Sequence, residues 1–209
     1  MNINNLFRKI INSYLQGSEI KNVKKKLTEG EIISNLKIED FKPTIALNLT
    51  YGDKKIELGS ELIWDSYVKQ MLSTQPTVSY KVANVSLALF TLAMIDIDTP
   101  TQKDAFYSQF RHMLLTNIPQ EDVAKASEPH TSPYIPLSQP AGCGKKRYVI
   151  LLAKQKQEYD KAPMDSNTLF KFDVIKFFKD NDMTLVGVTY FTVVGPPAKF
   201  CAVSNPKTI

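Results

Sequence analysis

Asp96-Ile-Asp-Thr-Pro100 is the stretch that decides the fold of this chain, together with two stretches that follow it. Phe110-Arg-His112 precedes an apolar run, and Tyr134–Gly144 leads directly into Lys146-Arg-Tyr148. All of these motifs adjoin segments whose residues are continuously apolar or alternate between apolar and polar, which is typical of strands. The chain is therefore expected to be rich in β-structure.

Outside these motifs, strands are expected to outnumber helices. The pattern predicts strands over residues 44–51, 55–58, 77–82, 87–95, 113–117, 148–154 and 185–194. It predicts an amphipathic helix over residues 4–16, and a helix over 169–179 with Phe170, Val174, Phe177 and Phe178 on one face. Short helical or irregular connections are expected at 20–27 and 30–36. Residues 119–141 carry five of the twelve prolines and are interpreted as a long loop, which in a compact domain is usually functional or disordered.

Length and composition fit one compact domain. The 209 residues are 43% hydrophobic, which is enough to bury a substantial core. The longest apolar run, near residues 87–97, is too short to span a bilayer and ends in acidic residues. Because polar residues occupy the place of a secretory signal's apolar segment, we expect no export by that route. A cytoplasmic location is predicted, with the mitochondrion as the alternative.

The two cysteines, Cys143 and Cys201, lie far apart and near no histidine cluster. They are expected to be reduced thiols of a cytosolic protein rather than zinc ligands or a disulfide. Gly142-Cys-Gly144 is too short for a phosphate-binding loop. We therefore expect no metal and no cofactor.

The net charge of +5 lies at the N-terminus. Residues 1–27 carry six basic side chains and one acidic side chain, whereas the rest of the chain is balanced. Residues 1–30 are interpreted as a basic helical appendage and residues 31–209 as the domain. The basic cluster Lys24-Lys-Lys26 is either a solvated helix face or a contact for an acidic partner, RNA or an anionic membrane surface.

The three motifs together resemble the phosphatidylethanolamine-binding protein (PEBP) family. Its segments read D-P-D-A-P, then a His before an apolar strand, then Y-x-G-x-x-P-P-x-G-x-G-x-H-R-Y-x-F, and the resemblance covers roughly residues 32–194. It implies a central antiparallel sheet, a second smaller sheet and peripheral helices. It also implies an anion pocket for a phospholipid headgroup, here formed by Asp96, Asp98, His112, Ser138, Pro140, Lys146 and Tyr148.

Several residues depart from the family pattern. Lys146 stands where the family has its second His, which keeps a cationic donor but removes an imidazole that can also accept a hydrogen bond. The pocket is therefore expected to be degenerate. Asp96 and Asp98 are equally well explained as acceptors within a turn, and His112 as a half-buried histidine with its hydrogen bonds satisfied. Arg147 is expected to support the loop structurally by pairing.

No nucleophile and base are arranged for catalysis, so a non-enzymatic binding protein is expected. The chain most resembles the fungal carboxypeptidase Y inhibitor branch. This resemblance implies a protease inhibitor whose N-terminal residues, here Met1 and Asn2, enter a serine carboxypeptidase. The alternative is a PEBP-fold subunit of the mitochondrial large ribosomal subunit that contacts rRNA and mitochondrial ribosomal proteins through its basic N-terminus.

Overall fold

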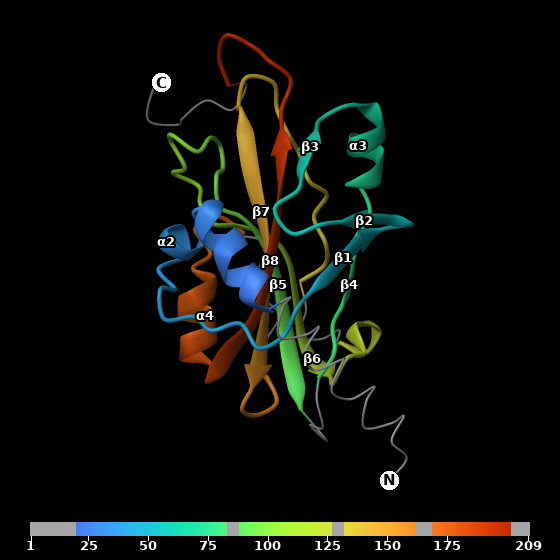
Figure 1. The fold of residues 1–209 in the computed structure, drawn as a ribbon, viewed down its shortest axis with the longest axis vertical. Coiled ribbons are helices and arrows are strands. Elements are labelled where there is room, and N and C mark those ends of the chain that lie inside the picture. Colours follow the sequence, from blue (N-terminus) through green and yellow to red (C-terminus); the bar gives the residue numbers. More distant parts are fainter. Residues whose placement is uncertain (1–19, 83–87, 127–131, 162–168, 202–209) are drawn as a thin grey trace.

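The fold has three layers, in which a five-stranded sheet lies between a layer of helices and a three-stranded sheet (Figure 1). The computed structural model describes residues 20–82, 88–126, 132–161 and 169–201. The helical layer comprises a helix over residues 20–29, α2 (Ile32–Leu36) and α4 (Val174–Asp180). The predicted helix over residues 4–16 lies outside the described residues.

The large sheet has the strand order β3-β8-β7-β5-β6. Its strands are β3 (Glu61–Ile63), β5 (Leu89–Asp96), β6 (Phe110–Pro119), β7 (Lys145–Gln155) and β8 (Met183–Val194). The small sheet joins β2 (Lys54–Ile56), β1 (Asn48–Tyr51) and β4 (Thr77–Ser79). The expected combination of a larger sheet, a smaller sheet and peripheral helices is confirmed. The central strands pair antiparallel as expected, and the short strand β3 joins the edge of the sheet parallel to β8.

The two faces of the large sheet belong to two hydrophobic clusters because side chains alternate along a strand. On β7, Val149 and Leu151 pack with the helical layer, whereas Ile150 and Leu152 pack with the small sheet. The helical layer contributes residues such as Leu27, and the small sheet contributes residues such as Leu49. Both faces of the large sheet are covered, which explains the almost continuously apolar sequence of β5 and β7.

Three short elements differ from the sequence expectations. β3 and α3 (Ser66–Met71) were not predicted, because neither is long enough to show a period, although Asp65 caps α3 by accepting a hydrogen bond from Val68 N at 2.7 Å. The short η1 turn (Val123–Lys125) lies within the predicted loop. The helix predicted over residues 169–179 begins only at Val174, after Asp173, and Phe170 lies outside it with 48% of its surface exposed.

Of the predicted appendage over residues 1–30, the structure describes the part from residue 20 onward. There it packs on the large sheet through Val23 and Leu27, and Tyr190 of β8 donates a hydrogen bond to Lys26 O at 3.2 Å. The division of the chain at residue 30 stays a prediction. None of the helices in the described ranges is long and apolar enough to cross a membrane.

Arg147 connects three parts of the fold. Its guanidinium donates to both carboxylate oxygens of Asp98, from Nη2 at 2.6 Å and from Nε at 2.8 Å, and its Nη1 donates to Gly30 O at 2.9 Å. Asp98 also accepts from the Arg147 backbone N–H at 2.8 Å. The pair therefore holds the turn after β5 and the end of the N-terminal helix against β7, in agreement with the structural role expected for Arg147.

A disulfide joins Cys143 to Cys201, so the prediction of two reduced cysteines is wrong. The tertiary fold brings the C-terminal segment over the turn at Gly142, where a Cβ atom would lie only 2.0 Å from Phe200 O. Gly142 also has a φ of +75°, which favours glycine. This contact could not be predicted from local sequence patterns, because the two cysteines are 58 residues apart.

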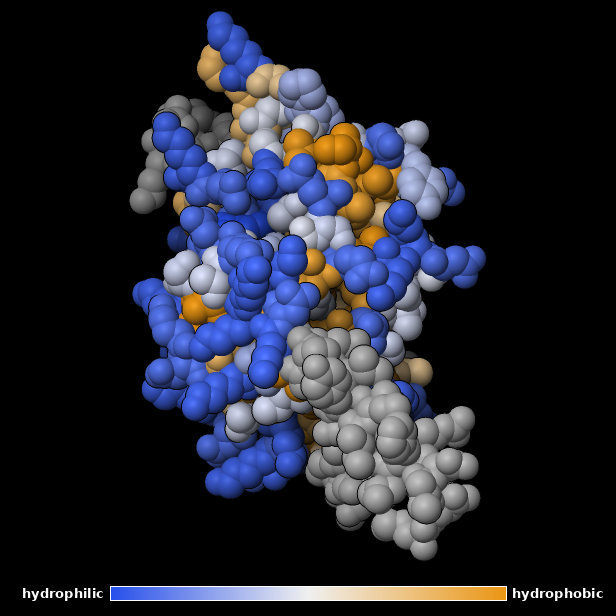
Figure 2. Space-filling view, in the orientation of Figure 1, coloured by the Kyte–Doolittle hydropathy of each residue, from blue (hydrophilic) through white to orange (hydrophobic). Residues whose placement is uncertain are grey.

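Figure 2 shows a largely hydrophilic surface with hydrophobic side chains gathered over β3 and α3. Ile63 of β3 and Tyr67 of α3 are the exposed large side chains in this region. Both come from elements that the sequence pattern did not predict.

Removing the Asp98 carboxylate should strongly destabilise the protein. Asp98→Ala removes the only buried carboxylate that pairs with Arg147 among the described residues, and leaves the guanidinium with Gly30 O and the exposed Glu31, 3.7 Å from Nη1. We expect the free energy of unfolding to fall by about 3–5 kcal/mol. The matched control, Glu61→Ala, breaks the exposed pair that Lys145 makes at 3.4 Å and should cost less than about 1 kcal/mol. Urea-induced unfolding measures both values. Equal losses in the two variants would contradict the connecting role of Arg147.

Candidate ligand-binding site

A cavity of about 390 Å³ opens at the end of the large sheet where β5, β6 and β7 meet two loops. Its volume lies in the range of small-molecule sites. Its lining consists of Asp96, Thr99, Tyr107, Phe110, His112, Ile135, Pro136, Ser138, Pro140, Lys146 and Phe170.

The floor of the cavity is a buried ion pair. Lys146 Nζ lies 3.0 Å from Asp96 Oδ2 and donates to Thr99 Oγ1 at 3.1 Å, and the Thr99 hydroxyl also donates to Asp96. The Lys146 and Asp96 side chains are only 5% and 2% exposed. Asp96 Oδ1 accepts from the Asp98 backbone N–H at 2.7 Å, so Asp96 is an acceptor within the turn, as one of its two interpretations predicts. The two opposite charges cancel, and the floor carries no net charge.

His112 stands beside this pair with its ring orientation fixed. Its Nδ1 lies 2.8 Å from Ile135 O, and since a carbonyl only accepts, Nδ1 carries the proton. The His112 carbonyl in turn accepts from Ile135 N at 2.7 Å. The pKa of His112 is lowered to about 4, chiefly by burial and to a smaller extent by Lys146, and the opposing effects of Asp96 and the Ile135 hydrogen bond do not offset this. The ring is therefore neutral at pH 7.

The mouth of the cavity is aromatic. The Phe170 ring lies 5.0 Å from Phe110 and 4.8 Å from Tyr107, and Phe110 lies 4.7 Å from the His112 ring. A backbone hydrogen bond from Arg111 N to Leu169 O at 2.8 Å holds the segment that carries Phe170 beside β6. The rings form a continuous apolar path from the surface to His112.

Comparison with known proteins supports one family. The family model named phosphatidylethanolamine-binding protein matches residues 52–191, which is more than half of the chain. The chain belongs to the PEBP family. Its relative TERMINAL FLOWER 1 of Arabidopsis thaliana is 31% identical over 131 residues, which cover 63% of this chain and 68% of that protein.

Solved PEBP structures share the fold. The carboxypeptidase Y inhibitor, solved in complex with its cognate proteinase, has a TM-score of 0.69 at 20% identity and covers 84% of this chain and 96% of its own. A phosphatidylethanolamine-binding protein from Plasmodium vivax has a TM-score of 0.68 at 17% identity, with coverages of 82% and 96%. At these identities the likeness shows the fold alone.

Most of the pocket residues implied by the PEBP resemblance line the cavity, namely Asp96, His112, Ser138, Pro140 and Lys146. Asp98 does not, because it turns to the opposite face of the sheet to pair with Arg147. Tyr148 lies beneath the cavity, stacked on Phe191 at 5.5 Å, and its hydroxyl donates to Ser138 O at 3.2 Å. Burial raises the pKa of the Tyr148 phenol, so it remains a donor that positions the Ser138 wall.

Sequence reasoning missed much of the PEBP cavity's lining. Thr99, Tyr107, Phe110, Ile135, Pro136 and Phe170 were not among the predicted site residues. The density of aromatic residues between Phe106 and Phe110 was an available signal for the mouth. Phe170 offered no such signal, because it comes from a distant segment whose pattern predicted a buried helix face.

The predicted partner contacts lie away from this cavity. Lys24 and Lys25 are exposed on the helix over residues 20–29, and Lys25 and Lys26 pair with Glu29 at 3.8 and 3.9 Å. Lys24 Nζ donates to Glu39 O at 3.3 Å. Met1 and Asn2 lie outside the described residues.

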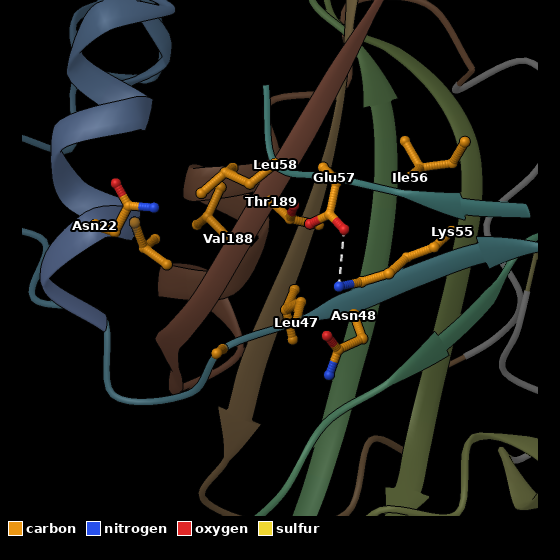
Figure 3. A pocket seen from close by; sticks show the side chains of 11 residues that line it. Asn22, Leu47, Asn48, Lys55, Ile56, Glu57, Leu58, Val188 and Thr189 are labelled. Atoms are coloured by element: carbon orange, nitrogen blue, oxygen red, sulfur yellow. Dashed lines mark ion pairs between the residues drawn. The ribbon is translucent and has the colours of Figure 1, made fainter. Parts of the chain in front are cut away.

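A second, smaller cavity of about 130 Å³ lies between that helix, the small sheet and β8 (Figure 3). Asn22 points into it from the helix, and Lys55 pairs across its edge with Glu57 at 2.8 Å. Both members of this ion pair are well exposed. Among the described residues, no group of His, Cys, Asp or Glu side chains could hold a metal ion in either cavity.

The buried His112 should make stability depend on pH. In the unfolded chain an imidazole has a pKa of about 6.5, so below that pH the unfolded state binds the proton before the folded state does. The free energy of unfolding should therefore fall by up to about 3 kcal/mol between pH 6.5 and pH 4 because of this residue. Urea unfolding of the wild type and of His112→Gln across this pH range separates the contribution of His112 from that of the carboxylates. Identical pH slopes for the two proteins would contradict it.

Proposed function

We propose that this PEBP-family chain is a non-catalytic binding protein whose ligand site is the cavity floored by Asp96 and Lys146. The observation that carries the proposal is that the lysine does not fill the cavity. Its ammonium is held on the floor by Asp96 at 3.0 Å and Thr99 at 3.1 Å, which leaves about 390 Å³ above it. A preformed concave site with an apolar mouth and a few convergent polar groups is the usual arrangement for a small ligand.

The chemistry of the site favours binding over catalysis. Cys143, which lies close in sequence to Lys145 and Lys146, is bonded to Cys201 and cannot supply a thiolate. Lys146 is an ion-paired ammonium rather than a neutral amine, so it is a poor nucleophile. His112 has the neutral ring that a base needs, but Ile135 and its own buried position fix it as part of the wall.

Blocking the cavity should abolish ligand binding without unfolding the protein. Ser138 is exposed at the cavity wall, and Ser138→Trp places an indole across the space. We expect small molecules that co-purify with the wild type, detected by native mass spectrometry, to be absent from this variant. Ser73→Trp, at an exposed position outside the lining, is the matched control and should retain them. A ligand retained equally by both variants would place the binding site elsewhere.

Inhibition of a serine carboxypeptidase is the second candidate function. It is favoured by the likeness in fold to the carboxypeptidase Y inhibitor, 96% of whose chain is covered. In that branch of the family the resemblance implies that the N-terminal peptide, rather than the cavity, enters the protease. The exposed Lys24 and Lys25 would then provide a second surface for an acidic partner.

Deleting residues 1–16 should abolish inhibition and leave the domain folded. The deletion spares residues 20–29, which pack on the large sheet through Val23 and Leu27. Hydrolysis of a peptide substrate by the carboxypeptidase measures inhibition, and thermal unfolding measures the fold. A chain with residues 1–16 in scrambled order controls for length and charge. Undiminished inhibition by the deletion variant would reject the inhibitor role.

The ribosomal alternative stays a prediction, and the basic N-terminus is one of the sequence features behind it. Salt-sensitive co-sedimentation with mitochondrial large subunits would favour it over both binding roles, because phosphate contacts weaken as salt rises. A cytoplasmic or mitochondrial location also stays a prediction. The Cys143–Cys201 disulfide is more typical of an oxidising compartment than of the cytosol.

A further inference from the structure

The polar groups of the cavity form a donor and an acceptor side by side. Among the described residues, Lys146 Nζ makes hydrogen bonds to Asp96 and Thr99, which use two of the three N–H groups of an ammonium. One N–H therefore remains for a ligand acceptor. His112 presents the complementary group, because its Nδ1–H is committed to Ile135 O and a neutral imidazole then carries a lone pair on Nε2.

An anion fits this floor poorly. The lining that the described residues form has one cation, Lys146, and one anion, Asp96. A phosphate would therefore gain the lysine and face the aspartate carboxylate beside it. The phosphate would also give up water molecules on entering the cavity, and the neutral His112 ring would not replace them, because its Nε2 is an acceptor and not a second donor. Burying a charge without net compensation is costly, whereas a neutral group incurs a much smaller cost.

A neutral hydroxyl group satisfies both polar neighbours at once. It donates one hydrogen bond, to His112 Nε2, and accepts another, from Lys146 Nζ. The apolar part of the ligand would then lie among Tyr107, Phe110 and Phe170, whose rings are 4.8 to 5.0 Å apart at the mouth. Aromatic rings pack favourably on one another in edge-to-face or offset geometry, which favours an aryl body over a flexible alkyl chain.

We propose that the cavity binds an uncharged aryl alcohol or phenol, with its hydroxyl between His112 and Lys146 and its ring at the aromatic mouth, rather than a phosphate. This inference rests on the proposed function, because it specifies the ligand of the same cavity. It departs from the anion pocket that the family resemblance implies. The departure follows from Lys146, whose charge is already neutralised by Asp96.

The test compares matched probes on the full-length protein. The probes are 4-ethylphenol, ethylbenzene, which lacks the hydroxyl, 4-ethylphenyl phosphate, which replaces it with a dianion, and inorganic phosphate. Titrations followed by the backbone amide signals of Ile135 and Lys146 in NMR spectra give the dissociation constants. We expect 4-ethylphenol to bind about tenfold or more tightly than ethylbenzene and than either phosphate, since it adds two hydrogen bonds and no charge.

The outcomes separate this inference from the proposed function. Tighter binding of 4-ethylphenyl phosphate or inorganic phosphate would overturn the neutral-ligand inference and leave the cavity as the ligand site. Equal binding of 4-ethylphenol and ethylbenzene would overturn the role given to His112 and Lys146. If no probe shifted these signals, and Ser138→Trp lost no co-purified ligand, the proposed function would fail as well.

Two variants test the assigned contacts. His112→Phe keeps an aromatic ring and removes Nε2, so 4-ethylphenol should bind no more tightly than ethylbenzene. Should that variant not fold, Phe170→Ala at its exposed position should weaken 4-ethylphenol several-fold. Tyr67→Ala, at a similarly exposed aromatic position outside the lining, is its control and should bind as the wild type does. Unchanged selectivity in His112→Phe, or unchanged affinity in Phe170→Ala, would refute the proposal.

Discussion

Two buried ion pairs at the start of β7 hold the end of β5 and the turn after it, and one of them also reaches the helical layer. Lys146 and Arg147 are neighbours in sequence, but alternation along the strand sends them to opposite faces of the large sheet. Arg147 faces the helical layer and pairs with Asp98, while Lys146 faces the cavity and pairs with Asp96. Asp96 is the last residue of β5 and Asp98 lies in the turn that follows, so the pairing of β5 with β7 brings both acids to their partners.

Because of this arrangement, the end of β5 and the turn after it both stabilise the fold and form part of the cavity. Asp98 accepts three hydrogen bonds from Arg147 and thereby anchors the helical layer at Gly30. Asp96 is left on the other face, where it neutralises Lys146, the one cation that the described residues contribute to the cavity lining. Buried ion pairs lose much of their Coulomb gain to desolvation, so their net contribution to stability is small. Their main effect here is to fix the positions of Asp96 and Asp98 relative to β7.

The cavity walls come from segments that are distant in sequence. The segment from Ser132 to Ile135 forms backbone hydrogen bonds with Leu114 and His112 of β6. The segment from Leu169 to Phe172 forms them with Arg111 of β6 and with Tyr107 and Gln109 just before that strand. These two segments place Ile135 at the side of His112 and Phe170 at the mouth. The disulfide from Cys143 to Cys201 then ties the C-terminal segment to the loop that carries Ser138 and Pro140.

The sequence by itself determined the strands of both sheets except β3, and the presence of a cluster at Asp96, His112 and Lys146, because hydrophobic patterning and motif order are local properties. Those residues were identified from the family's motifs as a pocket, and they line the cavity. Only the tertiary structure decided that Lys146 is neutralised rather than filling the space, that Asp98 turns away, and that Phe170 forms the mouth. It alone also decided that Cys143 meets Cys201 and that β3 joins β8 in parallel. Each of these features depends on a contact between residues far apart in the chain, and no local period or propensity records such a contact.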